Sequence, residues 1–388
     1  MSGAAQRAPL LAAGFTTAFG AHAVAGMLGT TTTGTAASLL ALGALLAIYD
    51  GAEVVLKPVF GTLADRIGAR TVLIAGLVIF AAASMTYVVA DDPAWLWVAR
   101  SGQGIGAAAF SPAASALVAL LTPAGSHGRA FGTYGSYKSV GYTLGPLLGG
   151  LIVTIGGLQT LFAVLAVLAG GVALWATVAV PAVRPQPRRR QTLLDTLRRF
   201  SESSFVTPTV ALAAATAALS AGVGFLPVLA TQAGLSPVAT GAIVSVLAMT
   251  TAVVQPIVGR LLDAGRTTFR TGIAAGFVLT PAGLAAAVLP GLAGLLCAAV
   301  VIGAGCGVIT PLAFTMLAQT TPAERLGQTM GAAEIGREGG DAAGPLIVAA
   351  VAAASSVPLG FVALAIIITT AGTALAGVER GRGRTRSP

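Results

Sequence analysis

Two groups of ionisable residues lie inside long apolar runs of the sequence. Asp50, Glu53 and Lys57 stand at positions i, i+3 and i+7 of one run. Residues at these spacings share one face of an α-helix, so the group predicts a charged stripe on an otherwise apolar helix. A second run carries four charges at i, i+3, i+4 and i+7, namely Glu334, Arg337, Glu338 and Asp341.

Lys138 also lies inside an apolar run, four residues from Tyr134 on one side and from Tyr142 on the other. An unpaired charge at the centre of a bilayer costs at least about 2.5 kcal/mol. Embedded charges must therefore face the protein interior, where they pair or line a wet cavity. At about 1.5 Å per residue, Asp50 is roughly 16 Å from the turn at Gly61, near the middle of a bilayer.

The carboxylates of the first group are candidates for proton coupling, because a carboxylate beside a cation can take up a proton on one side of a membrane and release it on the other. We expect Asp50 and Glu53 to form the main protonation centre, with Arg100 or Lys57 as the counter-charge. We expect a larger set to contact substrate or close the gate: Lys57, Tyr134, Lys138, Tyr142, Glu334, Arg337, Glu338 and Asp341. Alternatively, these charges are internal ion pairs that fix helix packing, since five embedded acids nearly balance four embedded bases.

The composition requires a bilayer as solvent. Of the 388 residues, 55% are hydrophobic and 9% are charged, whereas soluble proteins carry about 25% charged residues. Long apolar runs without two-residue alternation predict helices rather than a barrel. At about 20 residues per span, we predict an all-α membrane protein with twelve transmembrane helices. The expected spans are residues 9–29, 37–60, 71–90, 94–121, 128–154, 158–181, 207–231, 237–261, 270–289, 291–317, 327–352 and 356–377.

The basic residues are distributed asymmetrically along the chain. Of the 22 Lys and Arg, 18 lie at the two ends or in alternate connections, and such connections are cytoplasmic in membrane proteins. An even number of spans then places both termini in the cytoplasm, in a multi-pass protein of the inner (plasma) membrane. The net charge of +9 reports this topology and an attraction to anionic lipid, so nucleic acid is not an expected partner.

The sequence repeats itself in two halves. Gly145-Pro146 recurs as Gly344-Pro345, and Lys138 corresponds to Arg337, in each case 199 residues later. Parallel six-helix repeats are a transporter architecture, with the substrate site near mid-membrane. We expect two pseudo-symmetric six-helix bundles at 1–181 and 207–378, a basic cytoplasmic linker at 182–206 and a basic tail at 379–388. The carboxylates at positions 50 and 53 have no counterpart in the second half.

Three short patterns stand out: GTLADRIGAR at 61–70, RSGQGIG at 100–106 and GYTLGPLLGG at 141–150. Together they resemble motifs of the major facilitator superfamily, and the resemblance covers essentially the whole chain. The turn after the second span, GTLADRIGAR at 61–70, is similar to that family's loop motif, with Ala69 in place of a usual basic residue. Residues 100–106, RSGQGIG, are similar to its Arg-x-x-Gln-Gly motif. Residues 141–150, GYTLGPLLGG, are similar to the Gly-Pro-x-x-Gly-Gly motif associated with antiporters.

The resemblance implies an alternating-access transporter, most like the twelve-helix proton-coupled drug and metabolite antiporters. The residues it implies in conformational switching are Gly61, Asp65, Arg66, Arg70, Gly145 and Pro146. Asp65 can cap the start of the third helix or pair with a neighbouring helix end. The alternative for the turn is a purely topological and capping role, and the alternative for the fifth helix is simple packing.

We expect proton-coupled export of a small organic molecule by antiport, in a monomer whose partners are the substrate, protons and the bilayer. The alternative is a proton-coupled importer or a uniporter of a polar anionic or zwitterionic solute, such as an organic acid or sugar, which the two central cations favour. An enzyme or a non-transporting receptor is disfavoured, because the sequence offers no Ser-His-Asp set, metal cluster or phosphate loop. We expect no cofactor and no metal.

Overall fold

The computed structural model describes residues 3–28, 36–90, 92, 94–183 and 201–384, and helices make up most of this part of the chain. The helices are α1 Gly3–Leu28, α2 Ala36–Ile67, α3 Ala69–Val89, α4 Trp95–Leu120, α5 His127–Ala179, α7 Ser203–Gln232, α8 Pro237–Asp263, α9 Phe269–Ala286, α10 Gly291–Thr320, α11 Leu326–Ala354 and α12 Val357–Arg384. A short 3₁₀ turn, η2, spans Ala323–Arg325. The all-α fold expected from the sequence is confirmed.

The helix α5 contains two of the predicted spans. Its backbone leaves helical geometry at Gly157, with φ 77° and ψ 178°, a region that glycine enters without the steric cost of a Cβ. This kink lies between the spans predicted at 128–154 and 158–181. With α5 counted as two helices, the described helices are consistent with the twelve predicted spans.

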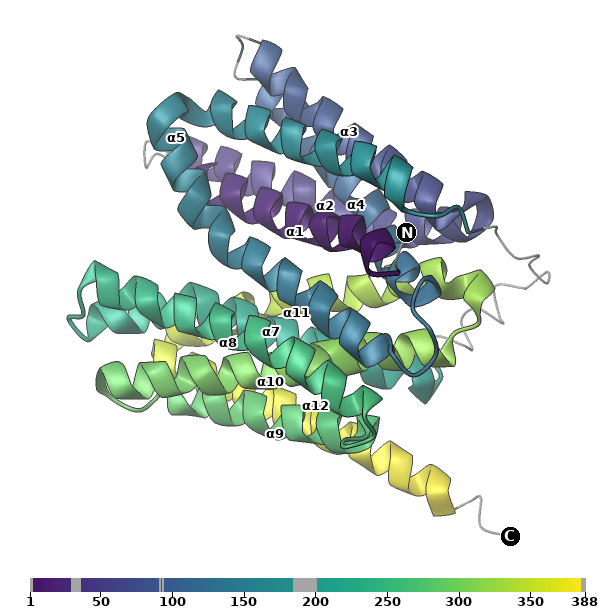
Figure 1. The fold of residues 1–388 in the computed structure, drawn as a ribbon. Helices are drawn as coiled ribbons and strands as arrows, with labels where there is room; N and C mark the ends of the chain where they lie inside the picture. The colour runs from purple at the N-terminus through teal and green to yellow at the C-terminus, as the bar shows by residue number, and fades with distance from the viewer. Residues whose placement is uncertain (1–2, 29–35, 91, 93, 184–200, 385–388) are drawn as a thin grey trace. The chain divides into compact units, whose positions relative to one another are not determined.

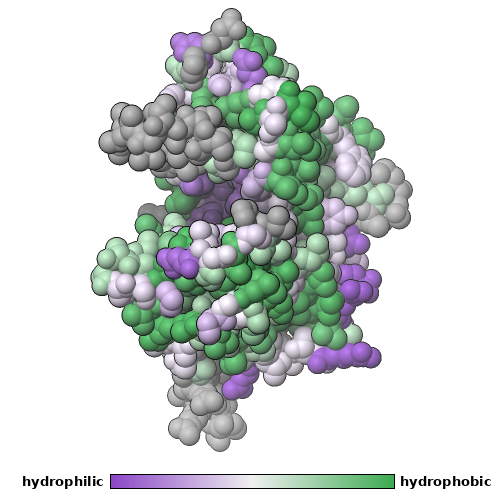
Figure 2. All heavy atoms as spheres, turned by 90° about the vertical axis from the view of Figure 1, so that its left-hand side faces the viewer, coloured by the Kyte–Doolittle hydropathy of each residue, from purple (hydrophilic) through white to green (hydrophobic). Residues whose placement is uncertain are grey.

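Nine helices in the described ranges are long and apolar enough to cross a membrane. The helices α2 and α11, which carry the two charged stripes, are not among these nine. Large apolar side chains also point outward: Val89, Ile155 and Val178 are 76%, 78% and 75% exposed. Figure 2 shows hydrophobic residues over much of one face. Lipid suits such a surface, because an apolar area of this extent is rare on soluble monomers.

The contacts divide the chain into two units. Unit 1 comprises Met1–Arg188 and Thr321–Ile335, and unit 2 comprises Arg189–Thr320 and Gly336–Pro388. The helix α11 therefore begins in unit 1 and ends in unit 2. The bundle boundaries predicted from the sequence stay predictions, and most of the predicted linker, at 184–200, lies outside the described residues.

Within unit 1, α4 packs on α2 and α3, while α5 packs on α1 and α3 (Figure 1). Within unit 2, α10 packs on α7, α8 and α9, and α12 packs on α7 and α9. The same close contacts recur in both units. A Cβ on Gly104 would lie 2.7 Å from the backbone oxygen of Tyr49, and one on Gly303 would lie 2.6 Å from that of Leu247. These pairs correspond in the internal repeat, so the repeat is present in the packing as well as in the sequence.

Candidate functional site

Four buried charged residues of unit 1 form what we call the charge cluster: Glu53 and Lys57 on α2, Lys138 on α5 and Glu334 on α11. The Nζ of Lys57 lies 2.5 Å from Oε2 of Glu53 and 3.4 Å from Oε2 of Glu334. The other oxygen of Glu334, Oε1, lies 3.9 Å from Nζ of Lys138. Glu334 therefore bridges two ammonium groups, in a cluster of two positive and two negative charges.

The charge cluster is almost completely removed from solvent. Lys57 and Glu334 are 0% exposed, and Glu53 and Lys138 are 4% and 7% exposed. Buried ions are tolerated when they are paired in good geometry, whereas removing one partner typically costs about 3–5 kcal/mol. The cluster thus meets the condition that embedded charges pair with one another inside the protein.

A close approach of α2 and the start of α11, both within unit 1, places Glu334 against Lys57. A Cβ on Gly331 would lie 2.5 Å from the backbone oxygen of Lys57, and one on Gly61 would overlap the backbone oxygen of Gly327. Glycines four apart, as at 327 and 331, let helix backbones approach closely. Glu334 follows about one turn later and so reaches the lysine. This glycine spacing is a sequence signal for a closely packed face at the start of α11, and it does not specify which helix packs there.

Asp65 holds the same end of α11. Its Oδ1 accepts a 2.7 Å hydrogen bond from the backbone N–H of Gly327, and its Oδ2 accepts one of 2.8 Å from that of Gln328. The first N–H groups of a helix lack internal partners, and a carboxylate there is stabilising. Of the two alternatives predicted for Asp65, the structure shows the contact with a neighbouring helix end. The N-cap of α3 is Gly68, which supplies no side-chain cap.

The other residues assigned to switching have different surroundings. Arg66 is exposed in the last turn of α2. Arg70 donates a 2.6 Å hydrogen bond from Nη2 to the backbone oxygen of Thr177, near the end of α5. Arg70 thus links the turn between α2 and α3 to the end of α5. A part in switching stays a prediction for both arginines.

The motif in α5 lies against α1. A Cβ on Gly145 would be 3.0 Å from the backbone nitrogen of Ala23, while Pro146 is exposed. In unit 2, the repeat counterpart Gly344 makes the equivalent close contact with Ala217 of α7. Close helix packing is therefore observed at this motif, and switching by Gly145 and Pro146 stays a prediction.

Arg100 occupies a second buried polar site of unit 1. Its guanidinium carbon is 4.2 Å from the ring centroid of Tyr49, an arrangement that stabilises a desolvated cation. Its Nη1 donates a 3.2 Å hydrogen bond to Gln103, whose Nε2 donates one of 2.9 Å to Ser84. Arg100 forms no ion pair with a carboxylate of the described residues. The cation that contacts Glu53 is therefore Lys57. Tyr49 and Gln103 are not among the residues predicted from the sequence, although Gln103 lies within the motif at 100–106.

The remaining predicted residues of unit 1 separate into two environments. Tyr134 is buried, and its ring centroid is 5.9 Å from Nζ of Lys138, so it adjoins the charge cluster. Tyr142 instead packs edge-on against His22, with 4.3 Å between ring centroids. Asp50 is exposed, unlike the buried carboxylates of the charge cluster.

The predicted stripe on α11 is divided between the two units. Glu334 belongs to unit 1, whereas Arg337, Glu338 and Asp341 belong to unit 2. Arg337 and Glu338 form an ion pair. The backbone oxygen of Arg337 also accepts a 2.7 Å hydrogen bond from Thr216 of α7.

In the part of the chain that the structure describes, no group of three or more His, Cys, Asp or Glu side chains could hold a metal ion. Cys297 is exposed and Cys306 is buried, and both are free thiols. What the site offers chemically is a set of buried charges paired with one another.

A helical membrane fold with two repeated halves is typical of multi-pass transporters. The family model described as Major Facilitator Superfamily matches residues 10–345, with a second match at 210–387. The chain belongs to the major facilitator superfamily and is a membrane transporter rather than an enzyme.

Similar proteins of this family include drug-resistance proteins. The chain is 43% identical over 93 residues to the puromycin resistance protein pur8 of Streptomyces alboniger, which is 24% of this chain and 18% of that protein. It is 38% identical over 103 residues to the methylenomycin A resistance protein of Bacillus subtilis, which is 26% and 22% of the two chains. It is 27% identical over 114 residues to the quinolone resistance protein NorA of Staphylococcus aureus, which is 29% of each. The matched regions thus span less than a third of these relatives.

Two solved structures share the fold at low sequence identity. The human organic anion transporter MFSD10 (TETRAN) has a TM-score of 0.78 and 16% identity, over 97% of this chain and 100% of that one. The Escherichia coli fucose:proton symporter FucP has a TM-score of 0.78 and 15% identity, over 100% of both chains. At this identity the likeness shows the fold.

Proposed function

We propose that this transporter exports a small organic molecule across the plasma membrane in exchange for protons, with both termini in the cytoplasm. The observation that carries the proposal is Glu334, a fully buried carboxylate that bridges Lys57 and Lys138. The drug-resistance relatives support export of an organic molecule, and they make puromycin and a quinolone sensible first substrates to test.

The charge cluster supplies a simple coupling step. When both of its carboxylates are ionised, its four charges cancel. A proton on Glu334 leaves a net charge of +1 and weakens the attraction to both lysines. Because Glu334 lies on α11, which the glycine contacts hold against α2 within unit 1, its protonation changes how firmly these two helices are joined. A proton can shift a conformational equilibrium only through such a difference between states.

Asp50 and Glu53 remain proposed coupling residues beside Glu334. Glu53 shares Lys57 with Glu334 and so belongs to the same charge cluster, whereas Asp50 is exposed. Neutralising either carboxylate is expected to abolish proton-coupled transport while the protein still inserts. We propose that Gly61, Asp65 and the contacts they make with the start of α11 form part of the conformational switch.

The test uses purified protein in vesicles with an imposed pH gradient and an internal pH-sensitive dye. Puromycin or a quinolone is added, and the expected result is proton efflux driven by substrate entry. Glu334→Gln should reduce this flux at least tenfold, because an amide cannot exchange a proton. Glu202→Gln is the matched control, since Glu202 is exposed at the start of α7, far along the chain from the charge cluster, and should transport normally.

Two results would refute the exchange mechanism. One is full proton flux in Glu334→Gln, Glu53→Gln and Asp50→Asn vesicles. The other is substrate movement at an unchanged rate when no pH gradient is present and protons do not move with it.

A second candidate is symport of an anionic solute with protons. Two lysines in the charge cluster and the aromatic face of Tyr134 beside Lys138 would suit a carboxylate-bearing ligand. In this mechanism a proton on Glu334 would leave positive charge to attract the anion, so proton and substrate would bind together instead of competing.

A further inference from the structure

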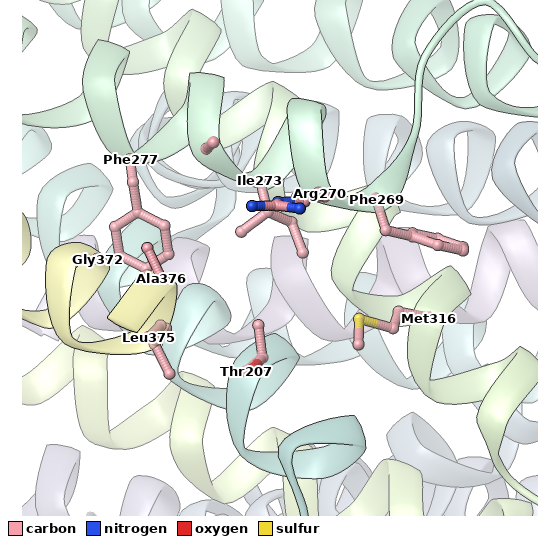
Figure 3. A pocket seen from close by; sticks show the side chains of 10 residues that line it. Thr207, Phe269, Arg270, Ile273, Phe277, Met316, Gly372, Leu375 and Ala376 are labelled. Atoms are coloured by element: carbon pink, nitrogen blue, oxygen red, sulfur yellow. The ribbon is translucent and has the colours of Figure 1, made fainter. Parts of the chain in front are cut away.

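A cavity of about 290 Å³ lies within unit 2, where side chains from α7, α9, α10 and α12 meet (Figure 3). Its walls are mainly apolar and include Ile273, Phe277, Met316 and Leu375. Arg270, on the first turn of α9, is its charged wall residue. Figure 3 shows the Arg270 side chain beside Ile273, with Phe277 on one side and Met316 on the other.

Arg270 is exposed and forms no ion pair with any carboxylate in the described ranges. Guanidinium groups favour bidentate contacts with phosphate or carboxylate oxygens. A small hydrophilic anion does not suit the apolar part of the cavity, because it would lose its hydration against Phe277 and Leu375. The two features together suit an amphipathic anion.

The surroundings indicate which amphipathic anion. Arg266 precedes α9, and α12 continues beyond the cavity into a segment that carries Arg380, Arg382 and Arg384. This is the basic end of both helices, which the positive-inside rule assigns to the cytoplasmic leaflet. That leaflet contains the anionic phospholipids, and basic pockets between membrane helices on this side bind their headgroups.

We propose that this cavity binds one anionic phospholipid of the cytoplasmic leaflet. Its phosphate lies at Arg270, and an acyl chain lies along Ile273, Phe277 and Leu375. The cavity volume is at the lower limit of about 300–1,000 Å³ for pockets that enclose a drug-sized ligand, so it accommodates part of a lipid better than a whole transported molecule. The bound lipid contacts both α9 and α12. Lipid binding here is a property separate from the proposed transport function, since the cavity includes none of the residues of the charge cluster.

The experiment measures lipid binding to the purified protein in neutral detergent by native mass spectrometry, with thermal unfolding as a second readout. The probes are phosphatidylglycerol, phosphatidylcholine with the same acyl chains, and glycerol phosphate without chains. Phosphatidylglycerol is expected to bind and to raise the unfolding temperature by several degrees, and the other two probes are expected to have little effect.

Two variants separate charge from volume. Arg270→Gln should weaken phosphatidylglycerol binding about tenfold, since it removes the charge-assisted contact. Ala274→Trp keeps the charge and fills part of the cavity, because Ala274 is an exposed wall residue, and it should weaken binding by a similar factor. Arg266→Gln is the matched control: it removes an exposed charge nearby that is not part of the wall, and binding should be unchanged.

Several outcomes would overturn the proposal. Equal binding of phosphatidylcholine would show that the anionic headgroup is not recognised, and effective competition by glycerol phosphate would show that the acyl chain is not. Binding that survives both Arg270→Gln and Ala274→Trp at the level of Arg266→Gln would place the lipid elsewhere. Should Arg270→Gln fail to fold, Ala274→Trp alone decides the result.

Discussion

Lys57 is the residue on which the charge cluster depends. It is fully buried and lies between two carboxylates, Glu53 from its own helix and Glu334 from α11. Each carboxylate alone would be a costly buried charge, and the lysine compensates both. These charges can therefore both fix helix packing and couple transport to protons. Protonation of a carboxylate removes the ion pair that stabilises the packed helices.

Replacing Lys57 should expose this dependence. Lys57→Met is expected to lower the free energy of unfolding by about 3–5 kcal/mol, because it leaves two buried carboxylates without the cation between them. The double variant Glu53→Gln/Lys57→Met removes one charge of each sign and should recover at least half of that loss. Chemical or thermal unfolding in detergent measures both changes.

The control for Lys57→Met is Arg66→Gln, which removes an exposed positive charge from the same helix. Surface changes of this kind usually alter stability by less than about 0.5 kcal/mol. If the double variant is as unstable as the sum of its two single variants, Glu53 and Lys57 do not interact energetically and do not belong to one charge cluster.

At the scale of elements, α2 and the start of α11 act as one structural piece of unit 1. The carboxylate of Asp65 caps α11 by accepting two hydrogen bonds from its backbone N–H groups, and glycines at 61, 327 and 331 bring the backbones together. The position of Glu334 relative to Lys57 follows from this contact, so the chemistry of the charge cluster depends on residues that carry no charge.

Gly61→Ala tests the helix contact. Its Cβ would overlap the backbone oxygen of Gly327, and a backbone atom cannot move aside as a flexible side chain can. We expect a loss of about 1–3 kcal/mol in stability, as for overpacked cores, together with impaired proton-coupled transport. Unfolding and vesicle assays on the same preparation measure both.

Gly51→Ala is the matched control for Gly61→Ala. Gly51 lies on the same helix, and a Cβ there would meet no described atom within 4 Å. Alanine in a helix is favoured over glycine by about 1 kcal/mol, so this variant should be equally or slightly more stable. Equal loss in the two variants would mean that the contact with α11 does not explain the effect.

Sequence periodicity predicts the faces of the charged helices but not which helices meet. The spacing of Asp50, Glu53 and Lys57 is enough to place a charged stripe on α2, and polar turns are enough to separate the spans. The partner of Lys57 on another helix is Glu334, 277 residues away, whereas the sequence pattern assigns Glu334 only to the substrate cavity. Such a pairing depends on tertiary packing of glycines and on a cap by Asp65, and neither is visible from the period of one helix.

At the scale of the whole molecule, the internal repeat explains what the two halves share and where they differ. The contact of Gly104 with Tyr49 recurs as that of Gly303 with Leu247, so the helix packing is duplicated. The carboxylates of α2 are not duplicated, since the second half has uncharged residues there. A common scaffold to which carboxylates are added on α2 and α11 suits the coupled transport proposed above, because the proton site must change its environment when the scaffold switches.

The sign of proton linkage decides between exchange and symport. In exchange, the substrate binds the form of the protein in which the charge cluster has lost its proton, so substrate binding releases a proton. Binding linkage is reciprocal, and the dissociation constant should then fall as pH rises, by up to about tenfold per pH unit for one displaced proton. In symport of an anion, proton uptake by Glu334 assists binding, and the dissociation constant should fall as pH decreases.

Calorimetric titration of puromycin and of an organic anion across the range from mildly acidic to mildly basic pH would measure this sign directly. We expect exchange, with tighter puromycin binding at high pH, and we expect Glu334→Gln to flatten the dependence because the titrating group is gone. A dissociation constant that does not change with pH in the unaltered protein would show that the charge cluster does not couple proton and substrate binding. An unchanged slope in Glu334→Gln would move the coupling proton to Glu53 or Asp50, where the same titration with Glu53→Gln and Asp50→Asn would locate it.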